Sequence, residues 1–215
     1  MTNAEVAQRL LHSVAARIFP GSSPGLRFFK MKKKVYLIHG WGGSSEGGWF
    51  DWLKSELEKK GFEVYAFDMP ETNEPKIEKW VGYLEEKISP DEINEHTYFI
   101  GHSIGCQTIL RFLEKLHKHE RVAGCVFVAG WFDLINLNQE EMKIAHPWVN
   151  SEIHFERISD HCNNFLSIFS EDDPYVHLDE VEKFKTNLGS KIIIKEHKGH
   201  FEKVNKIPEI LEFVR

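Results

Sequence analysis

The segment "GHSIGC" (101–106) combines a residue type and a spacing that favour nucleophilic chemistry. Ser103 stands between Gly101 and Gly105, with one residue on either side of it. The preceding stretch 97–100 is typical of a β-strand, and the following stretch 106–116 has apolar residues at helical spacing. A serine on a sharp turn from strand to helix is the context of a nucleophile elbow. The pattern predicts a nucleophilic Ser103, with an ordinary glycine–serine turn as the alternative.

A serine hydroxyl needs a base, because the free alcohol is a poor nucleophile at neutral pH. Among twelve histidines, His200 is singled out by a glycine-containing loop that follows the last predicted strand. That strand and the strand before Ser103 end at the same edge if the sheet is parallel, so the two loops converge. The alternative candidates for the base are His197, His39 and His102. We expect His102 to point away from Ser103, because it is the adjacent residue in the chain.

Three acids follow the predicted strand 164–170, namely Glu171, Asp172 and Asp173. Such a run is usually just solvated. This loop, however, follows the carboxyl end of its strand, at the same side of the sheet as the loops of Ser103 and His200. One of the three is expected to orient the imidazole and to stabilise its protonated form.

An oxyanion formed by attack on a carbonyl needs two N–H donors. The Ile104 amide opens the helix after Ser103, where amides lack helical partners. The second donor is expected in the glycine-rich loop 39–49, where the Trp41 amide is the natural choice. This loop has no Walker-type or dinucleotide-type glycine pattern, which argues against a nucleotide cofactor. Two short histidine pairs, at 117–119 and 197–200, lack ligand partners at metal-site spacing, so no metal or other cofactor is predicted.

Strand and helix signals alternate along the chain, which predicts an α/β fold with a doubly wound, mostly parallel sheet and helices on both faces. The expected strands are 34–40, 62–68, 97–100, 121–130, 164–170 and 191–197, and the expected helices are 49–61, 74–88, 106–116, 178–188 and 207–214.

Residues 131–160 interrupt this alternation, since they show no single period. Loops after strand carboxyl ends face the ligand crevice in such sheets, so the segment is a candidate small cap. An irregular crossover without a substrate role is the alternative. We expect His39, Trp131 and Trp148 to contribute to the substrate pocket, although the tryptophans could instead pack the loops onto the sheet.

The composition fits a globular protein, with 41% hydrophobic and 28% charged residues. A net charge of −6 gives no reason to expect nucleic acid as a partner, and no apolar run approaches the ~20 residues of a membrane span. Three cysteines without C-x-x-C spacing indicate reduced thiols and a cytoplasmic protein. A small-molecule substrate is expected, with a monomer or small oligomer and with room for a protein partner.

Residues 1–30 differ from the rest, because they carry four basic side chains against one acidic. We interpret them as an N-terminal extension, flexible or docked as a helix, that precedes the predicted α/β domain at 31–215. An organellar transit peptide is the alternative interpretation.

The segments "VYLIHGWGG", "GHSIGC", "SEDDPYV" and "GHF" occur in an order and at separations that resemble the α/β-hydrolase superfamily. Within it, the chain is similar to small serine hydrolases related to retinoblastoma-binding protein 9 and the bacterial YdeN proteins. The resemblance covers about residues 33–215 and implies a Ser103–Asp173–His200 triad. The histidine of "HGW" departs from some relatives, which have proline there.

The resemblance implies a serine hydrolase that cleaves a small ester, thioester or amide through an acyl-enzyme. Two other functions stay open at this point. One is a protein-interaction module on a hydrolase fold with weak or incidental catalysis, and the other is a different reaction on this fold, such as that of a lyase.

Overall fold

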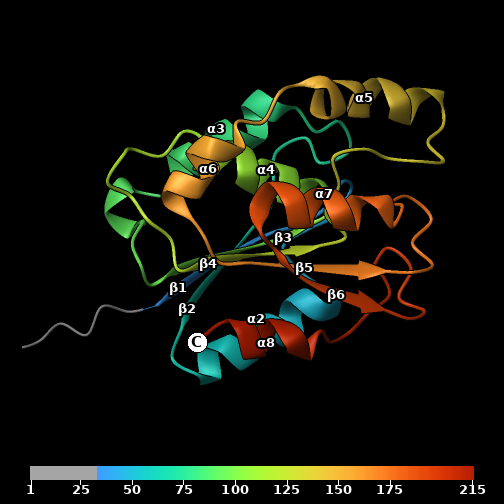
Figure 1. Cartoon of the computed structure of the whole chain (residues 1–215). Helices are drawn as coiled ribbons and strands as arrows, with labels where there is room; N and C mark the ends of the chain where they lie inside the picture. Colours follow the sequence, from blue (N-terminus) through green and yellow to red (C-terminus); the bar gives the residue numbers. More distant parts are fainter. Residues whose placement is uncertain (1–32) are drawn as a thin grey trace, which may run out of the picture. The chain divides into compact units, whose positions relative to one another are not determined.

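The computed structural model describes residues 33–215, which form one parallel sheet flanked by helices (Figure 1). The predicted division into an extension at 1–30 and a domain at 31–215 stays a prediction, because residues 1–32 lie outside the described part. The sheet order is β2-β1-β3-β4-β5-β6, and every neighbouring pair is parallel. The strands are β1 (Lys34–Ile38), β2 (Glu63–Phe67), β3 (Thr97–His102), β4 (Gly124–Val128), β5 (Phe165–Ser170) and β6 (Lys191–Lys195).

Helices cover both faces of this sheet. In Figure 1, α2 and α8 lie on one face, while α3, α4, α6 and α7 lie on the other, with α5 further out beyond them. The α-helices are α2 (Gly48–Lys59), α3 (Ile77–Lys87), α4 (Ile104–Leu113), α5 (Gln139–Asn150), α6 (Phe155–His161), α7 (Asp179–Leu188) and α8 (Pro208–Phe213), and a 3₁₀ turn spans Pro90–Glu92. No helix of residues 33–215 is long and apolar enough to cross a membrane.

Two hydrophobic cores result from this arrangement, one on each side of the sheet. Along β1, Tyr36 and Ile38 belong to one core, whereas Val35 and Leu37 belong to the other. Successive side chains of a strand point to opposite faces, and both faces are covered, so β1 and β4 read as continuous apolar runs. The predicted doubly wound α/β architecture is therefore confirmed.

The structure differs from the sequence prediction at the boundaries that matter for the site. Strand β3 continues to His102 instead of ending at 100, and α4 begins at Ile104 instead of 106. Ser103 is therefore the single residue between strand and helix, which makes the turn sharper than expected.

The segment 131–160 contains a helix of its own, α5, and most of α6. Asn138 starts α5 because its side chain accepts hydrogen bonds from the amides of Glu140 and Glu141, and the Glu141 carboxylate accepts from the Asn138 amide. This reciprocal capping box supplies partners to amides that the first helical turn leaves unpaired. The missing single period is thus explained by two short helices.

Candidate active site

Ser103 occupies a strained backbone position between β3 and α4. Its φ of 51° and ψ of −120° lie in a region that residues with a side chain rarely adopt. The Ser103 amide donates to the carbonyl oxygen of Val128 on the neighbouring strand, at 2.9 Å. Ser103 is therefore fixed at the carboxyl end of the central strands, as a nucleophile elbow requires.

The glycines around Ser103 are required by close packing. A Cβ at Gly101 would lie 2.7 Å from the amide nitrogen of Cys106, and a Cβ at Gly105 would lie 2.4 Å from the carbonyl oxygen of Ile38. Both distances are shorter than carbon contacts allow, so only glycine lets α4 approach β3 and β1 this closely. The glycine–serine spacing seen in the sequence is therefore a packing requirement of the turn.

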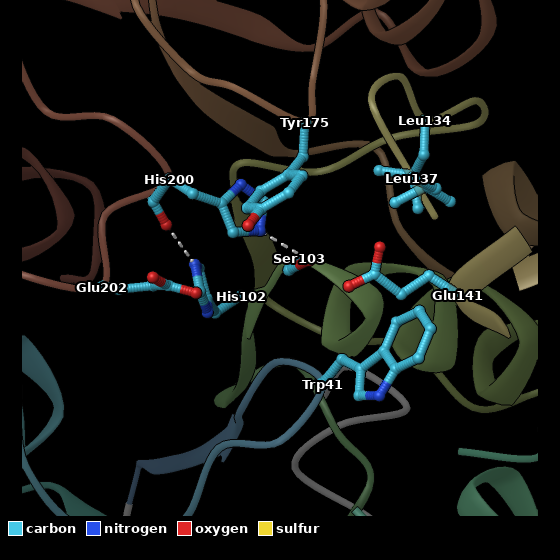
Figure 2. Close-up of a pocket in the computed structure, with 9 residues that line it drawn as sticks. All are labelled: Trp41, His102, Ser103, Leu134, Leu137, Glu141, Tyr175, His200 and Glu202. Carbon is cyan, nitrogen blue, oxygen red and sulfur yellow. Dashed lines mark hydrogen bonds between the residues drawn. The ribbon is translucent and has the colours of Figure 1, made fainter. Parts of the chain in front are cut away.

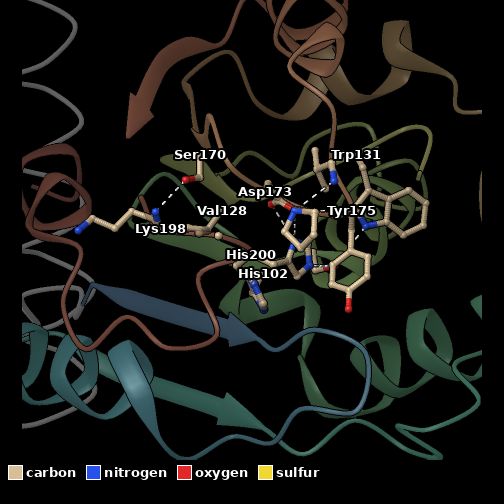
Figure 3. A network of polar contacts seen from close by, with 12 residues as sticks. His102, Val128, Trp131, Ser170, Asp173, Tyr175, Lys198 and His200 are labelled. Carbon is tan, nitrogen blue, oxygen red and sulfur yellow. Dashed lines mark hydrogen bonds and ion pairs between the residues drawn. The ribbon is translucent and has the colours of Figure 1, made fainter. Parts of the chain in front are cut away.

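His200 lies in the loop after β6 and faces Ser103. Its Nε2 is 2.9 Å from the Ser103 Oγ (Figure 2), and its Nδ1 is 2.8 Å from the Asp173 Oδ2 (Figure 3). When Nδ1–H donates to the carboxylate, Nε2 is left to accept the serine proton. His197, the rival in the same loop, is exposed. Chemically, this arrangement can raise the nucleophilicity of the serine hydroxyl.

The Asp173 side chain is almost fully buried and is held by more than the imidazole. Its Oδ1 accepts hydrogen bonds from the amides of Tyr175 and Val176, at 2.9 and 3.1 Å. Its side chain is only 1% exposed. Backbone donors fix the carboxylate in the orientation that meets the His200 ring.

Asp172 faces a different set of partners. Its Oδ1 accepts from the Ser170 hydroxyl at 2.6 Å and from the amides of Lys198 and Gly199 at 3.0 and 2.9 Å. These hydrogen bonds, the Ser170 one first, lower the pKa of Asp172 below its usual value. Asp172 therefore ties the loop after β5 to the loop that carries His200.

His102 also supports His200, a role that sequence reasoning missed. Its Nε2 lies 2.7 Å from the carbonyl oxygen of His200, and the centroids of the two imidazole rings are 5.0 Å apart (Figure 2). Burial, and then the neighbouring His200, lower the pKa of His102 to about 3. His102 is therefore neutral at pH 7, and its Nε2–H donates to the carbonyl. No local sequence signal gives this contact, which joins residues 98 positions apart.

The two amides expected in an oxyanion hole are both available. Among residues 33–215, neither the Trp41 amide nor the Ile104 amide has a hydrogen-bond partner. The Trp41 loop is anchored because the indole N–H donates to the Asn73 carbonyl and the Gly42 amide donates to the Thr72 carbonyl, each at 2.9 Å.

A pocket of about 200 Å³ opens beside Ser103 (Figure 2). Part of the predicted cap segment, from Leu134 to Glu141, forms one of its walls. The lining residues are Trp41, His102, Ser103, Leu134, Leu137, Glu141, Tyr175, His200 and Glu202. Sequence reasoning missed Glu141, Glu202, Tyr175 and the two leucines. Glu141 lies in the first turn of α5 and the others lie in loops, where no periodic signal marks a pocket residue.

Trp131, expected in the substrate pocket, lies behind Ser103. It is 1% exposed and its indole N–H points at the Ser103 Oγ, 3.3 Å away. The main-chain carbonyl of Trp131 accepts from the Gln107 side chain at 2.8 Å. Trp131 thus contacts the serine without lining the open pocket.

The structure does not bring Trp148 or His39 into this pocket. The Trp148 ring is buried against Trp80, and its N–H donates to the Pro75 carbonyl. The His39 Nε2 accepts from the Met69 amide at 3.0 Å, and burial lowers the pKa of His39. Both residues are held by internal polar partners and neither lines the pocket beside Ser103, although His39 lines a neighbouring hollow together with Trp41 and His102.

Comparison with known proteins agrees with this architecture. A family model described as serine hydrolase matches residues 35–208. YdeN from Bacillus subtilis (strain 168) is 29% identical over 171 residues, covering 80% of this chain and 87% of YdeN.

Solved structures give the same result. The structure of the B. subtilis ydeN gene product has a TM-score of 0.75 at 27% identity, covering 84% of this chain and 96% of that one. The esterase RhEst1 from Rhodococcus sp. ECU1013 has a TM-score of 0.62 at 15% identity, covering 85% and 90%, and shows likeness of fold alone. The chain belongs to the serine hydrolase family and has the α/β-hydrolase fold.

Proposed function

We propose that this protein hydrolyses a small ester, thioester or amide through an acyl-enzyme, with Ser103 as nucleophile, His200 as base and Asp173 as the orienting acid. The observation that supports this most is the continuous hydrogen-bonded series from the Ser103 hydroxyl through both nitrogens of the His200 ring to the Asp173 carboxylate. A structural or binding role requires no such series at the mouth of a pocket.

In the first half of the proposed reaction, the Ser103 Oγ attacks the carbonyl carbon while the His200 Nε2 takes the hydroxyl proton. His200 then gives that proton to the departing alcohol, thiol or amine, and the acyl group stays on Ser103. In the second half, His200 takes a proton from water, and the resulting nucleophile attacks the acyl-enzyme. The carboxylic acid leaves and the proton returns to the serine.

Asp173 holds the imidazole in the required tautomer and stabilises its positive charge. The negative oxygen of each tetrahedral intermediate is proposed to accept from the Trp41 and Ile104 amides. The Ile104 amide opens α4, where the aligned peptide dipoles favour negative charge. These donors are preorganised, so little rearrangement is required as the charge develops.

The pocket supports a small substrate. Its volume of about 200 Å³ lies below the roughly 300–1,000 Å³ of sites for drug-sized ligands. Leu134, Leu137 and the Tyr175 ring offer apolar contact beside Ser103. The interaction-module alternative is less favoured, because it leaves the buried acid and the fixed imidazole unexplained. The cytoplasmic location and the oligomeric state stay predictions.

The direct test of this function compares the intact protein with Ser103→Ala on 4-nitrophenyl esters of increasing acyl length. We expect the substitution to abolish turnover while the circular dichroism spectrum and melting temperature stay nearly unchanged, since no core side chain is removed. Turnover by the variant near the wild-type rate would show that Ser103 is not the nucleophile.

A further inference from the structure

Glu141 is a fixed carboxylate that faces the proposed nucleophile. It is the third residue of α5, and its Oε2 accepts the Asn138 amide at 2.8 Å, which holds the side chain in place. The other oxygen, Oε1, has no hydrogen-bond partner among residues 33–215. Figure 2 shows the Glu141 carboxylate directed toward the space in front of Ser103.

The pocket as a whole carries negative charge. Glu141 and Glu202 are its charged lining residues, no lysine or arginine joins them, and neither forms an ion pair within the described part of the chain. His102 adds no compensating charge, because burial keeps its pKa at about 3. The α5 N-terminus contributes only about half a positive charge. A partly enclosed pocket with this lining concentrates a negative potential beside Ser103.

Aromatic rings complete the wall. Trp41 is anchored by its indole hydrogen bond, and the Tyr175 ring packs edge-on against the His200 ring with 5.3 Å between centroids. Aromatic faces attract cations through their negative π-clouds, most strongly for organic cations that are easily desolvated. Carboxylates beside such rings match an amine or a quaternary ammonium group better than a neutral or anionic one.

We propose that the protein prefers substrates that carry a positively charged amine or ammonium group, and that Glu141 is the residue that determines this preference. The proposal rests on the proposed hydrolase function. It predicts discrimination against substrates bearing a carboxylate or a phosphate, because these would be repelled by both pocket carboxylates. No covalent step is involved, since Glu141 acts only on substrate binding.

The test uses pairs of esters that differ in charge and share the same shape. The acyl-side pair is the 4-nitrophenyl esters of 4-(trimethylammonio)butanoate and 5,5-dimethylhexanoate. The alcohol-side pair is the butyrate esters of choline and of 3,3-dimethylbutanol. For each pair, kcat/KM is measured for the wild type and for Glu141→Gln. The wild-type-to-variant comparison cancels the intrinsic reactivity difference between the two esters.

We expect Glu141→Gln to lower kcat/KM for the cationic ester of at least one pair roughly three- to fivefold, with the neutral ester changed less than twofold, which is the scale of a partly exposed charge pair. Glutamine can still accept the Asn138 amide, so α5 keeps its cap. Glu140→Gln, in the same turn but outside the pocket lining, is the matched control and should change neither ester. Raising NaCl from 50 to 500 mM should shrink the wild-type preference.

Equal losses for both members of each pair, or no loss for either cationic ester, would overturn the charge preference. That failure is distinct from failure of the hydrolase function. If Ser103→Ala abolishes hydrolysis, but Glu141→Gln leaves the preference of the wild type for the cationic esters unchanged, only this inference is wrong. If hydrolysis persists in Ser103→Ala, the hydrolase proposal itself is wrong.

Discussion

Two helices border the candidate site, and they are embedded very differently. Every residue of α4, which begins directly after Ser103, is buried, whereas only Ala145 and Trp148 are buried in α5, which carries Glu141. Helix α4 packs on β3 and its apolar side chains belong to one of the two hydrophobic cores, while α5 is anchored by its cap and by the Trp148 side chain. The difference indicates that the carboxyl ends of the strands hold their side chains in fixed positions, whereas the α5 segment, which forms one wall of the pocket, is less constrained by packing.

This contrast assigns different kinetic roles to the two regions. Groups at the sheet edge are proposed to act on the reacting atoms, so their loss should appear in kcat. Groups on the pocket wall from Leu134 to Glu141 are proposed to contact only the substrate's outer parts, so their loss should appear mainly in KM. The predictions below test this division, beginning with the largest expected effect.

The largest effect is expected at the proposed base. His200→Ala should lower kcat by about 10⁶-fold, the scale seen when a triad histidine is removed, because Ser103 loses its proton acceptor. His197→Ala, in the same loop but exposed, should change kcat less than about twofold. Both variants are assayed on one activated ester. If His197→Ala is the inactive variant, the assignment of the base is wrong.

The adjacent aspartates should differ by orders of magnitude. Asp173→Asn should lower kcat by about 10⁴-fold, since an amide cannot hold the imidazole in the required tautomer. Asp172→Asn should cost about tenfold or less, because it weakens only hydrogen bonds that fix the His200 loop. The measurement is kcat of both variants on one activated ester. A larger loss of kcat in the Asp172 variant than in the Asp173 variant, or equal losses in the two, would contradict the assignment of the acid.

A smaller effect is expected from the support that His102 gives. His102→Leu removes the donor to the His200 carbonyl and should lower kcat by about tenfold with KM little changed. His102→Gln, whose amide group can occupy the Nε2 position, should recover most of that loss. A Gln variant as slow as the Leu variant would show that the hydrogen bond is not what matters.

His102 also makes a prediction about stability. Its pKa is lowered from the unfolded value near 6.5 to about 3, so the unfolded chain binds the extra proton between these pH values. Stability from this group is therefore complete above about pH 6.5 and is lost as the pH falls toward 3. The melting temperature of His102→Gln relative to wild type should rise on going from pH 7 to pH 4. A constant difference would contradict the neutral state of His102.

The smallest effect is expected on the α5 side of the pocket. Leu137→Ala should raise KM for an apolar ester roughly three- to tenfold through lost contact area, with kcat within about twofold. The measurement is a Michaelis–Menten comparison on one 4-nitrophenyl ester. A fall in kcat with unchanged KM would break the proposed division between the sheet edge and the wall.

The parts of the site that could be predicted from sequence are those fixed by local chain geometry. Ser103 was recognisable because the elbow needs glycines on both sides, and His200 because it follows the last strand. The choice of Asp173 over Asp172 needed the family resemblance, since the two residues are adjacent and both are aspartates. The burial of Trp148 against Trp80 could not be predicted, because the sequence does not show whether a tryptophan in this segment lines a pocket or packs beneath one.

Other features depended on contacts between distant segments. The His102–His200 hydrogen bond and the position of Glu141 join parts of the chain that no local pattern connects. The fold itself was more predictable, because each strand and helix carries its own periodic signal. The exception was the segment 131–160, where α5 begins at a capping box and contains Pro147, and no long apolar repeat marks the helix.

The central claim is that Ser103 is an activated nucleophile, and covalent labelling tests it most directly. The protein is treated with a fluorophosphonate probe, and the modified residue is located by mass spectrometry of the digested protein. We predict one modification, at Ser103, that is absent in Ser103→Ala and strongly slowed in His200→Ala. Failure to label the folded wild-type protein, or labelling of a different residue, would contradict the account.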